Sequence, residues 1–355
     1  MKKTIAFHSN QISIRGTEVA LYDYALHNES VLGHNSVVVY NLNSPHNDAA
    51  ALAKFRERFD VVGYRARAEL DPLLAQHRAD LLYAIKAGKN DGLWSRTVPT
   101  MVHAVFPTNP AQAHGASYAF ISEWLSRHCS NNKIPCVPHI VELPDDNGDL
   151  RAELNIPTRA KVLGCYGGAQ SFDVPSAMEA VRQVLVESAD TWFVFLNIAR
   201  FVDHPRALFL PGSSDLATKT RFINTCDAML HARLQGESFG LACGEFSIRN
   251  KPVITYARSK HRHHIDVLGD AGFYYTDAAS LVGIIEKLDP VALRQRSWDR
   301  YSARYNRDVV MGLFDEHLIQ PALRNRDRAK PELSLRWTDR LAYYRLKLRM
   351  RLGSA

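Results

Sequence analysis

The sequence lacks any apolar run long enough to form a membrane-spanning helix. Such a helix needs about 20 consecutive apolar residues, and no run in the 355 residues approaches that length. Near the N-terminus, Met1-Lys2-Lys3 precedes only a short apolar stretch at 4–7, which is shorter than the core of a secretory signal. We therefore expect a cytoplasmic protein that neither spans a membrane nor is exported.

Cysteine is also scarce, and its positions show no paired spacing. The sequence contains no C-x-x-C pair, which argues against a disulfide framework and against a cysteine zinc site. We expect free thiols in a reducing compartment. The five cysteines are Cys129, Cys136, Cys165, Cys226 and Cys243.

Acidic residues are few in the last part of the chain. Residues 324–355 hold ten Lys and Arg against three acids, and this excess equals the whole net charge of +7. The remainder is neutral, so we expect no nucleic-acid partner. Within the tail, 336–352 has the spacing of a basic amphipathic helix, which fits an anionic membrane surface and equally fits packing on the protein itself. Its apolar stripe consists of Trp337, Leu341, Tyr344, Leu348 and Leu352.

The body of the chain, which supplies most of the 46% hydrophobic content, alternates short apolar runs with segments of helical periodicity. This alternation predicts parallel sheets with crossover helices, and it restarts after a turn-rich stretch at 144–149. We expect two doubly wound, Rossmann-like α/β domains at 1–145 and 146–320, followed by a basic helical tail at 321–355. The expected strands are 4–7, 36–40, 81–84, 100–105 and 119–122, then 162–166, 191–197, 208–210, 228–230 and 253–255.

Two carboxylates, Glu237 and Glu245, stand out in a strand, loop and helix pattern at 226–255. An apolar strand precedes them, and Ser238 is expected to cap a helix that opens at Phe239. Ligands of open α/β sheets bind at the carboxyl ends of strands, and helix-start amides attract anions. We therefore expect a site for an anionic ligand here.

The segment Glu237-Ser-Phe-Gly-Leu-Ala-Cys-Gly-Glu245 resembles the donor-site motif of retaining glycosyltransferases of the GT-B fold, family 4 in particular. The resemblance implies two domains facing across a cleft. It also implies that Glu245 binds the ribose hydroxyls of a nucleotide sugar and that Glu237, as a catalytic residue, contacts the transferred sugar. The backbone around Ser238, Phe239, Gly240 and Leu241 would face the sugar and the diphosphate, with Gly240 permitting close approach.

Three further segments resemble parts of the same family. Arg15-Gly16-Thr17-Glu18 resembles its Gly-Gly-x-Glu loop, with Gly16 and Thr17 beside the donor; the alternative is an ordinary turn capped by Thr17. His103 resembles the catalytic interlobe histidine, although a structural histidine is the alternative. Ser122-Glu123-Trp124 resembles a Val-Ser-x segment and equally fits a simple helix cap.

The chain departs from the family in the first loop of the second domain. Family members carry Gly-Arg there and a Lys about six residues later, which neutralise the leaving diphosphate, whereas 166–175 contains neither cation. We expect Gly168 and Ser171 to supply hydrogen-bond donors, and Arg200 or Arg206 to supply the charge. Arg233 and Arg258 are further substitutes.

The segment Lys260-His261-Arg262-His263-His264 looks like a metal cluster at first sight. Adjacent imidazoles rarely converge on one ion, and no nearby Cys or paired carboxylate completes a shell. We therefore expect a polar edge of the binding site, with no metal and no cofactor beyond the donor substrate.

These features predict a metal-independent, retaining hexosyltransferase that moves a sugar from a nucleotide-diphosphate sugar to a glycan or lipid-linked acceptor. The pathway implied is the synthesis of a surface glycan or polysaccharide, on the inner face of a membrane if the tail binds lipid. Two alternatives stay open: a GT-B nucleotide-sugar epimerase or hydrolase, and a non-catalytic protein that binds sugar or a membrane surface.

Overall fold

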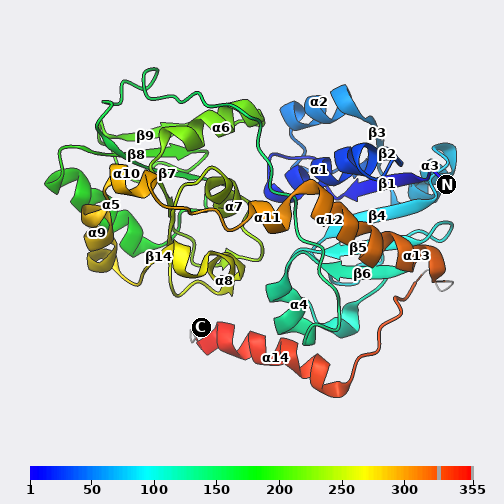
Figure 1. The fold of residues 1–355 in the computed structure, drawn as a ribbon. Helices are drawn as coiled ribbons and strands as arrows, with labels where there is room; N and C mark the ends of the chain where they lie inside the picture. The colour runs from blue at the N-terminus through cyan, green and yellow to red at the C-terminus, as the bar shows by residue number, and fades with distance from the viewer. Residues whose placement is uncertain (326–328, 353–355) are drawn as a thin grey trace. The chain divides into compact units, whose positions relative to one another are not determined.

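The computed structural model describes residues 1–325 and 329–352, which form two compact units (Figure 1). Unit 1 comprises Met1–Ile140 and Tyr305–Leu352, and unit 2 comprises Val141–Arg304. Each unit contains one six-stranded parallel sheet with helices on its faces. The predicted architecture of two doubly wound α/β domains is confirmed.

The unit boundaries differ from the predicted domains. The first crossing follows Ile140 rather than residue 145, and the chain returns to unit 1 at Tyr305, within the range assigned to the second domain. The return has a packing cause, because Phe314 stacks on Tyr24 with ring centroids 5.2 Å apart and also contacts Tyr83. The described part of 321–355 likewise belongs to unit 1 and is no separate tail.

The sheet of unit 1 has the order β3-β2-β1-β4-β5-β6. Its strands are β1 (Thr4–Ser9), β2 (Asn35–Asn41), β3 (Asp60–Tyr64), β4 (Leu81–Lys86), β5 (Thr100–Ala104) and β6 (Ser117–Phe120). Its helices are α1 (Gly16–Ser30), α2 (Ala49–Arg58), η1 (Arg67–Glu69), α3 (Leu70–Gln76), η2 (Pro110–Gln112), α4 (Glu123–Ser130), α12 (Arg307–Phe314), the π-helix η4 (Asp315–Ile319), α13 (Gln320–Arg324) and α14 (Trp337–Leu352).

The alternation of side chains along β1 divides the core of unit 1 between the two sheet faces. Phe7 meets Tyr83 and Phe314 on the face covered by α1 and α12. Ala6 packs on the opposite face with Leu70 and Leu74 of α3. The strands are apolar on both faces, as expected for a buried parallel sheet.

The sheet of unit 2 has the order β14-β12-β10-β7-β8-β9. Its strands are β7 (Lys161–Tyr166), β8 (Thr191–Leu196), β9 (Ala207–Leu210), β10 (Ala228–His231), β12 (Val253–Tyr256) and β14 (Gly272–Tyr275), and a separate parallel pair consists of β11 (Gly236–Glu237) and β13 (His261–Arg262). Its helices are α5 (Pro175–Glu187), α6 (Leu216–Thr225), α7 (Leu241–Ile248), α8 (His263–Leu268), η3 (Gly269–Ala271), α9 (Ala278–Lys287) and α10 (Pro290–Arg294), and α11 (Ser302–Tyr305) spans the return to unit 1.

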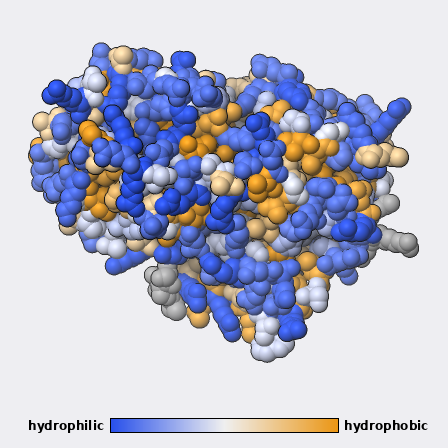
Figure 2. Space-filling view, viewed as in Figure 1, coloured by the Kyte–Doolittle hydropathy of each residue, from blue (hydrophilic) through white to orange (hydrophobic). Residues whose placement is uncertain are grey.

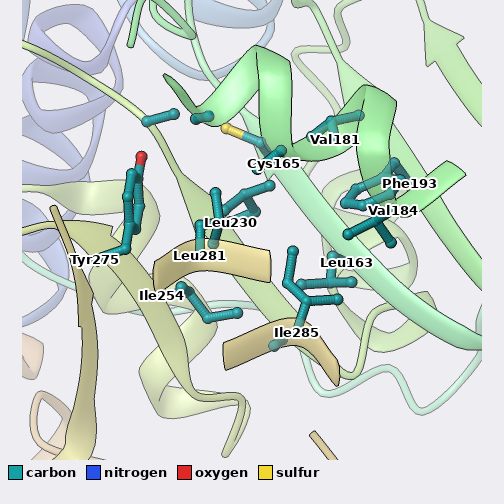
Figure 3. Close-up of a cluster of buried hydrophobic side chains, with 14 of the residues drawn as sticks. Leu163, Cys165, Val181, Val184, Phe193, Leu230, Ile254, Tyr275, Leu281 and Ile285 are labelled. Carbon is teal, nitrogen blue, oxygen red and sulfur yellow. The ribbon is translucent and has the colours of Figure 1, made fainter. Parts of the chain in front are cut away.

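The main core of unit 2 lies between its sheet and the pair α5 and α9 (Figure 3). Leu163, Leu230 and Ile254 come from three neighbouring strands, and Val181 and Ile285 from the two helices; all five are buried. Each fully buried side chain of this size contributes about 1.5–3 kcal/mol relative to exposure. This core fixes the strand ends that carry the candidate site.

Figure 2 shows a mainly hydrophilic face with scattered hydrophobic groups, which is ordinary for a folded protein. Among the described residues, no helix combines the length and the apolar character that crossing a membrane requires.

Four of the cysteines are buried: Cys129, Cys165, Cys226 and Cys243. Burial raises the pKa of the Cys226 thiol to about 12.

Candidate functional site

The topology of unit 2 places a switch point between β7 and β10. The chain continues from β7 to its neighbour β8 on one side, and from β10 to its neighbour β12 on the other side. The connections that leave β7 and β10 therefore run in opposite directions. Such a point, at the carboxyl edge of the sheet, is where open α/β sheets bind ligands. Both glutamates singled out in the sequence follow β10, on β11 and α7.

Glu237 is held by a cation and a histidine. Its Oε1 accepts from Arg233 Nη1 at 2.9 Å and lies 3.3 Å from His231 Nε2. Burial alone would raise the pKa of this carboxyl, but the hydrogen bond from His231 and the charge of Arg233 lower it to about 2. Glu237 is therefore an ionised carboxylate with a fixed orientation, and about a fifth of its side chain is exposed.

A chain of hydrogen bonds continues behind Glu237. His231 Nδ1 lies 2.8 Å from Thr255 Oγ1, which in turn lies 3.0 Å from His264 Nε2. Because a carboxylate only accepts, His231 Nε2 must carry the proton that faces Glu237. Burial lowers the pKa of His264 well below its usual value, so this imidazole is neutral. The chain fixes the ring of His231 and thereby the carboxylate.

Glu245 is buried on α7 and forms an ion pair with Lys219, whose Nζ lies 3.2 Å from Oε1. Lys219 is in the first turn of α6, and its Nζ also lies 5.4 Å from the ring centroid of Tyr166, the last residue of β7. A buried cation thus stands directly before the loop that starts at Gly167. No sequence motif had pointed to it.

The start of α7 differs from the prediction. The helix begins at Leu241 with Gly240 as its N-cap, in a left-handed conformation with φ of 94°, and Ser238 is not the cap. The Phe239 ring is buried and stacks on His263 at 5.3 Å, so only its backbone remains a candidate for ligand contact. The absence of a side-chain cap leaves the first amides of α7 suited to an anion.

The loop after β7 is stabilised by a hydrogen bond between two of its own residues. Ser171 Oγ donates to Gly168 O at 2.7 Å, so the hydroxyl proton expected to serve a ligand is engaged in the turn. Gly168 is exposed, and a Cβ there would have no atom within 4 Å. The donor role of Gly168 stays a prediction, whereas the hydroxyl of Ser171 stabilises the loop.

The two arginines proposed as the missing cations lie at opposite ends of the sheet. Arg200 is more than half exposed, pairs with Asp203 at 3.5 Å and lies over the ring of Phe209 on the edge strand β9. Arg206 donates to Thr191 O and Leu185 O at the opposite end of the sheet, where β8 starts and α5 ends. The expectation for Arg206 is therefore wrong. Arg200 follows the carboxyl end of β8, and Ala199 N donates to Ala169 O of the loop after β7 at 2.9 Å, so a role for Arg200 stays a prediction. Arg258 is exposed, and Arg233 serves Glu237.

The histidines at 261–264 point to different partners. His261 Nε2 lies 2.8 Å from Gln235 Nε2, His263 packs on Phe239, and His264 contacts Thr255. Within residues 1–325 and 329–352, no group of three potential ligands is arranged to hold a metal ion. His261 lies on β13, and His263 and His264 lie at the start of α8, so the three rings make separate contacts.

In unit 1, the loop after β1 is organised around a buried carboxylate. Glu18 accepts from Ser9 Oγ at 3.0 Å and from Ser13 Oγ at 2.5 Å, and burial raises its pKa. The N-cap of α1 is Arg15, without a side-chain cap, so Thr17 is not the cap. Gly16 is exposed at an uncapped helix start, beside the switch point between β1 and β4.

His103 is a structural residue of unit 1. The ring is buried, Nδ1 lies 2.8 Å from Tyr83 OH, and Nε2 lies 2.8 Å from Val137 O. Burial lowers its pKa to about 4, so it is neutral with both nitrogens engaged. A catalytic role for His103 is therefore not supported, because neither nitrogen is available to a substrate. Ser122 is a cap, with Oγ accepting from Leu125 N at 3.2 Å.

The sequence pattern did not single out Lys219, His231 and Thr255, and it gave His264 only as part of the polar edge at 260–264. Lys219 had one usable signal, since a lysine in the first turn of a helix opposes the helix dipole and calls for a specific partner. His231 ends a buried strand, which is the position where parallel sheets place ligand-side residues. Thr255 had no such signal.

No protein-family model matches the chain, and no curated protein matches it. Solved structures do match. A glycosyltransferase from Rickettsia africae ESF-5 gives a TM-score of 0.60 at 11% identity, covering 91% of this chain and 96% of that chain. Anabaena Alr3699/HepE in complex with UDP-glucose gives 0.59 at 15% identity, with coverage of 90% and 97%.

A third match is a UDP-N-acetylglucosamine 2-epimerase, with a TM-score of 0.57 at 12% identity and coverage of 89% and 96%. At these identities the similarity concerns the fold. Each matched protein is aligned over nearly its whole length, through both parallel six-stranded sheets of this chain. The two units of this chain therefore have the α/β architecture of the GT-B fold.

Proposed function

We propose that this protein is a glycosyltransferase that uses a nucleoside-diphosphate sugar. The observation that carries the proposal is a pair of carboxylates at one switch point, each matched to its own cation: Glu237 with Arg233, and Glu245 with Lys219. Carboxylates suit sugar hydroxyls, and cations with helix-start amides suit phosphate. Both kinds of group occur together at the carboxyl edge of unit 2.

In this proposal the donor's diphosphate lies between the loop at Gly168 and the start of α7, with Lys219 as the cation that replaces the family's Arg and Lys. Lys219 stands beside Tyr166, directly before the glycine loop, and therefore has the right location. Glu245 orients Lys219 and binds the ribose hydroxyls. Positive charge at this point stabilises the leaving diphosphate as its negative charge develops.

Glu237 contacts the transferred sugar. During transfer the bond between the anomeric carbon and the phosphate oxygen breaks, and a bond to the acceptor oxygen forms. The acceptor's proton leaves with the nucleoside diphosphate.

The proposal includes further properties that rest on the Glu-x7-Glu resemblance. They are retention of configuration, a hexose as the sugar, and independence from metal ions and cofactors. A glycan or lipid-linked acceptor and a role in surface polysaccharide synthesis rest on the same resemblance. The contacts of Gly16, Thr17, Ser238 and Leu241 with the donor remain predictions.

A second candidate function is rearrangement of the nucleotide sugar without an acceptor. The observation in its favour is the match to a UDP-N-acetylglucosamine 2-epimerase, which is about as similar in fold as the glycosyltransferases. Both reactions break the anomeric bond to the diphosphate, so the switch-point residues do not separate them.

Turnover assays with and without an acceptor test the proposed function. We expect the purified protein to release nucleoside diphosphate from a nucleotide sugar only slowly when alone, and faster with a mixture of glycan and lipid-linked acceptors. The product would carry the sugar on the acceptor, as seen by mass spectrometry. A product that is an isomer of the donor, formed without acceptor, would favour the epimerase. No turnover of any common nucleotide sugar would contradict both enzymes.

A further inference from the structure

The basic helix α14 is docked on unit 1, against α4 and η2 (Figure 1). Ala342 and Leu346 are buried in this contact. At the start of the helix, Asn131 Nδ2 donates to Asp339 Oδ1 at 3.2 Å and to Thr338 O at 3.3 Å. These contacts fix which side of α14 faces the protein.

The docked side is not the apolar stripe expected from the sequence. Trp337, Tyr344 and Leu348 are 73%, 56% and 57% exposed. At about 100° per residue, the three side chains fall within about 40° of one another and roughly opposite Leu346. The hydroxyl of Tyr344 nevertheless accepts from Asn109 Nδ2 at 3.0 Å, so its polar end is held by unit 1 while its ring stays exposed. Leu341, the fourth member, is half-buried at the edge, and the side chain of Leu352 lies outside the described residues. The helix therefore packs on its own protein and still presents an outward apolar stripe, which consists of Trp337, Leu348 and the ring of Tyr344.

Cations flank this stripe on both sides. By the same helical geometry, Arg340, Lys347 and Arg351 lie on one flank and Arg345 on the other, and all four are exposed. The one acidic residue of α14, Asp339, is on the docked side, where Asn131 and the Arg336 amide bind it. The outward face thus carries positive charge and no negative charge.

We propose that the outward face of α14 binds the surface of an anionic lipid bilayer. A Trp side chain such as Trp337 is suited to the depth of the headgroups, where the ring is desolvated while its polar atom stays hydrated. The flanking cations reach anionic headgroups at the same depth, since long basic side chains extend their charge toward the polar region. The proposal does not depend on which reaction unit 2 performs.

Two other occupants fit the same face less well. A nucleic acid is bound chiefly by cations that contact phosphates, and this contact does not bury the exposed Trp337 and Leu348. The rest of the chain is neutral and offers no further basic surface. A second copy of the chain would bring two rows of like charge together around the stripe, which is unfavourable. An anionic bilayer satisfies the apolar stripe and the cations at once.

Co-sedimentation with vesicles tests the proposal on the full chain. We expect binding to phosphatidylcholine vesicles that contain phosphatidylglycerol and little binding to phosphatidylcholine alone. The double variant Arg340→Gln/Arg351→Gln should bind about 30-fold more weakly, because each cation near an anionic surface contributes about 1 kcal/mol of binding free energy. Trp337→Ala/Leu348→Ala should also weaken binding while the cations remain. Because these side chains are exposed, circular dichroism and the melting temperature should stay unchanged.

The matched control removes two exposed cations outside α14, in Lys89→Gln/Arg159→Gln, and should bind as the wild type does. Equal loss in this control would overturn the proposal, because net charge rather than α14 would then be responsible. Failure of the wild type to prefer anionic vesicles would also overturn it. If the wild type did not bind vesicles, binding to duplex DNA would also overturn the proposal. The same holds for a dimer that the Leu348 variant abolishes.

Discussion

Replacing Glu237 by Gln should lower the rate of sugar transfer by about a hundred-fold or more, the usual loss when one preorganised electrostatic group is removed. The variant keeps the shape of the side chain and loses its charge. Arg233 and His231, which now hold the carboxylate, would then face a neutral amide. Because the diphosphate is assigned to Lys219 and the helix start, the affinity for nucleoside diphosphate should change only severalfold. Steady-state kinetics with titration of the nucleotide separate the two effects.

The control for this variant is Glu179→Gln, an exposed glutamate on α5 of the same unit, which should retain wild-type turnover. A second readout is the free energy of unfolding as a function of pH. The folded pKa of Glu237 is about 2, below the unfolded value, so its contribution is complete above about pH 5 and is lost as the pH falls toward 2. Glu237→Gln should remove that share of the acid destabilisation. Unchanged turnover in the Glu237 variant would refute the assigned role.

Gly236→Ala should destabilise unit 2 and disable the site together. Gly236 has φ of 65°, and an added Cβ would lie 2.1 Å from His261 O, in the parallel pair of β11 and β13. The left-handed conformation alone costs about 1–2 kcal/mol with a side chain, and the clash must also shift a backbone. We expect the free energy of unfolding to fall by at least about 2 kcal/mol, as urea denaturation would measure.

Gly283→Ala is the matched control for this substitution. Gly283 lies inside α9 of the same unit, and a Cβ there would meet nothing within 4 Å. Alanine should stabilise the helix by about 0.5–1 kcal/mol. If both variants lost stability to a similar extent, the special geometry assigned to Gly236 would be incorrect.

The central strands of both sheets were predictable because they are apolar on both faces. The runs at 81–84 and 228–230 appear as Leu81–Lys86 and Ala228–His231, lengthened at the carboxyl end by Ile85 and Lys86 in the first strand and by His231 in the second. Strands β3 and β14 escaped notice. Both lie at sheet edges, contain glycine and are partly exposed, so their sequences carry little periodic signal.

The return of the chain to unit 1 at Tyr305 could not be predicted from composition. The helices after it are amphipathic, and an amphipathic pattern says that a face is buried without saying where. The partner of Phe314 is the cluster of Tyr24 and Tyr83, which comes from two distant segments.

The same limitation separates the correct and incorrect parts of the predicted site. The sequence placed Glu237 and Glu245 at a strand end, and the topology confirms that position. It could not identify the cations, because Lys219 and Glu245 lie on different helices and are 26 residues apart in the sequence. Arg206 looked suitable by sequence position and lies at the other end of the sheet.

Calorimetric titration with UDP, GDP, ADP and dTDP in turn tests the assignment of the switch point in unit 2 most directly. The wild type should bind, and Lys219→Met/Glu245→Gln should bind at least about tenfold more weakly, since a charge-assisted contact to phosphate is lost. The double variant is chosen because a single change would leave one buried charge without its partner. Arg159→Gln, which removes an exposed cation before the start of β7, should bind as the wild type does, and Arg200→Gln tests the other predicted cation. Unchanged affinity in the Lys219 variant, or a loss confined to Arg200→Gln, would contradict the account.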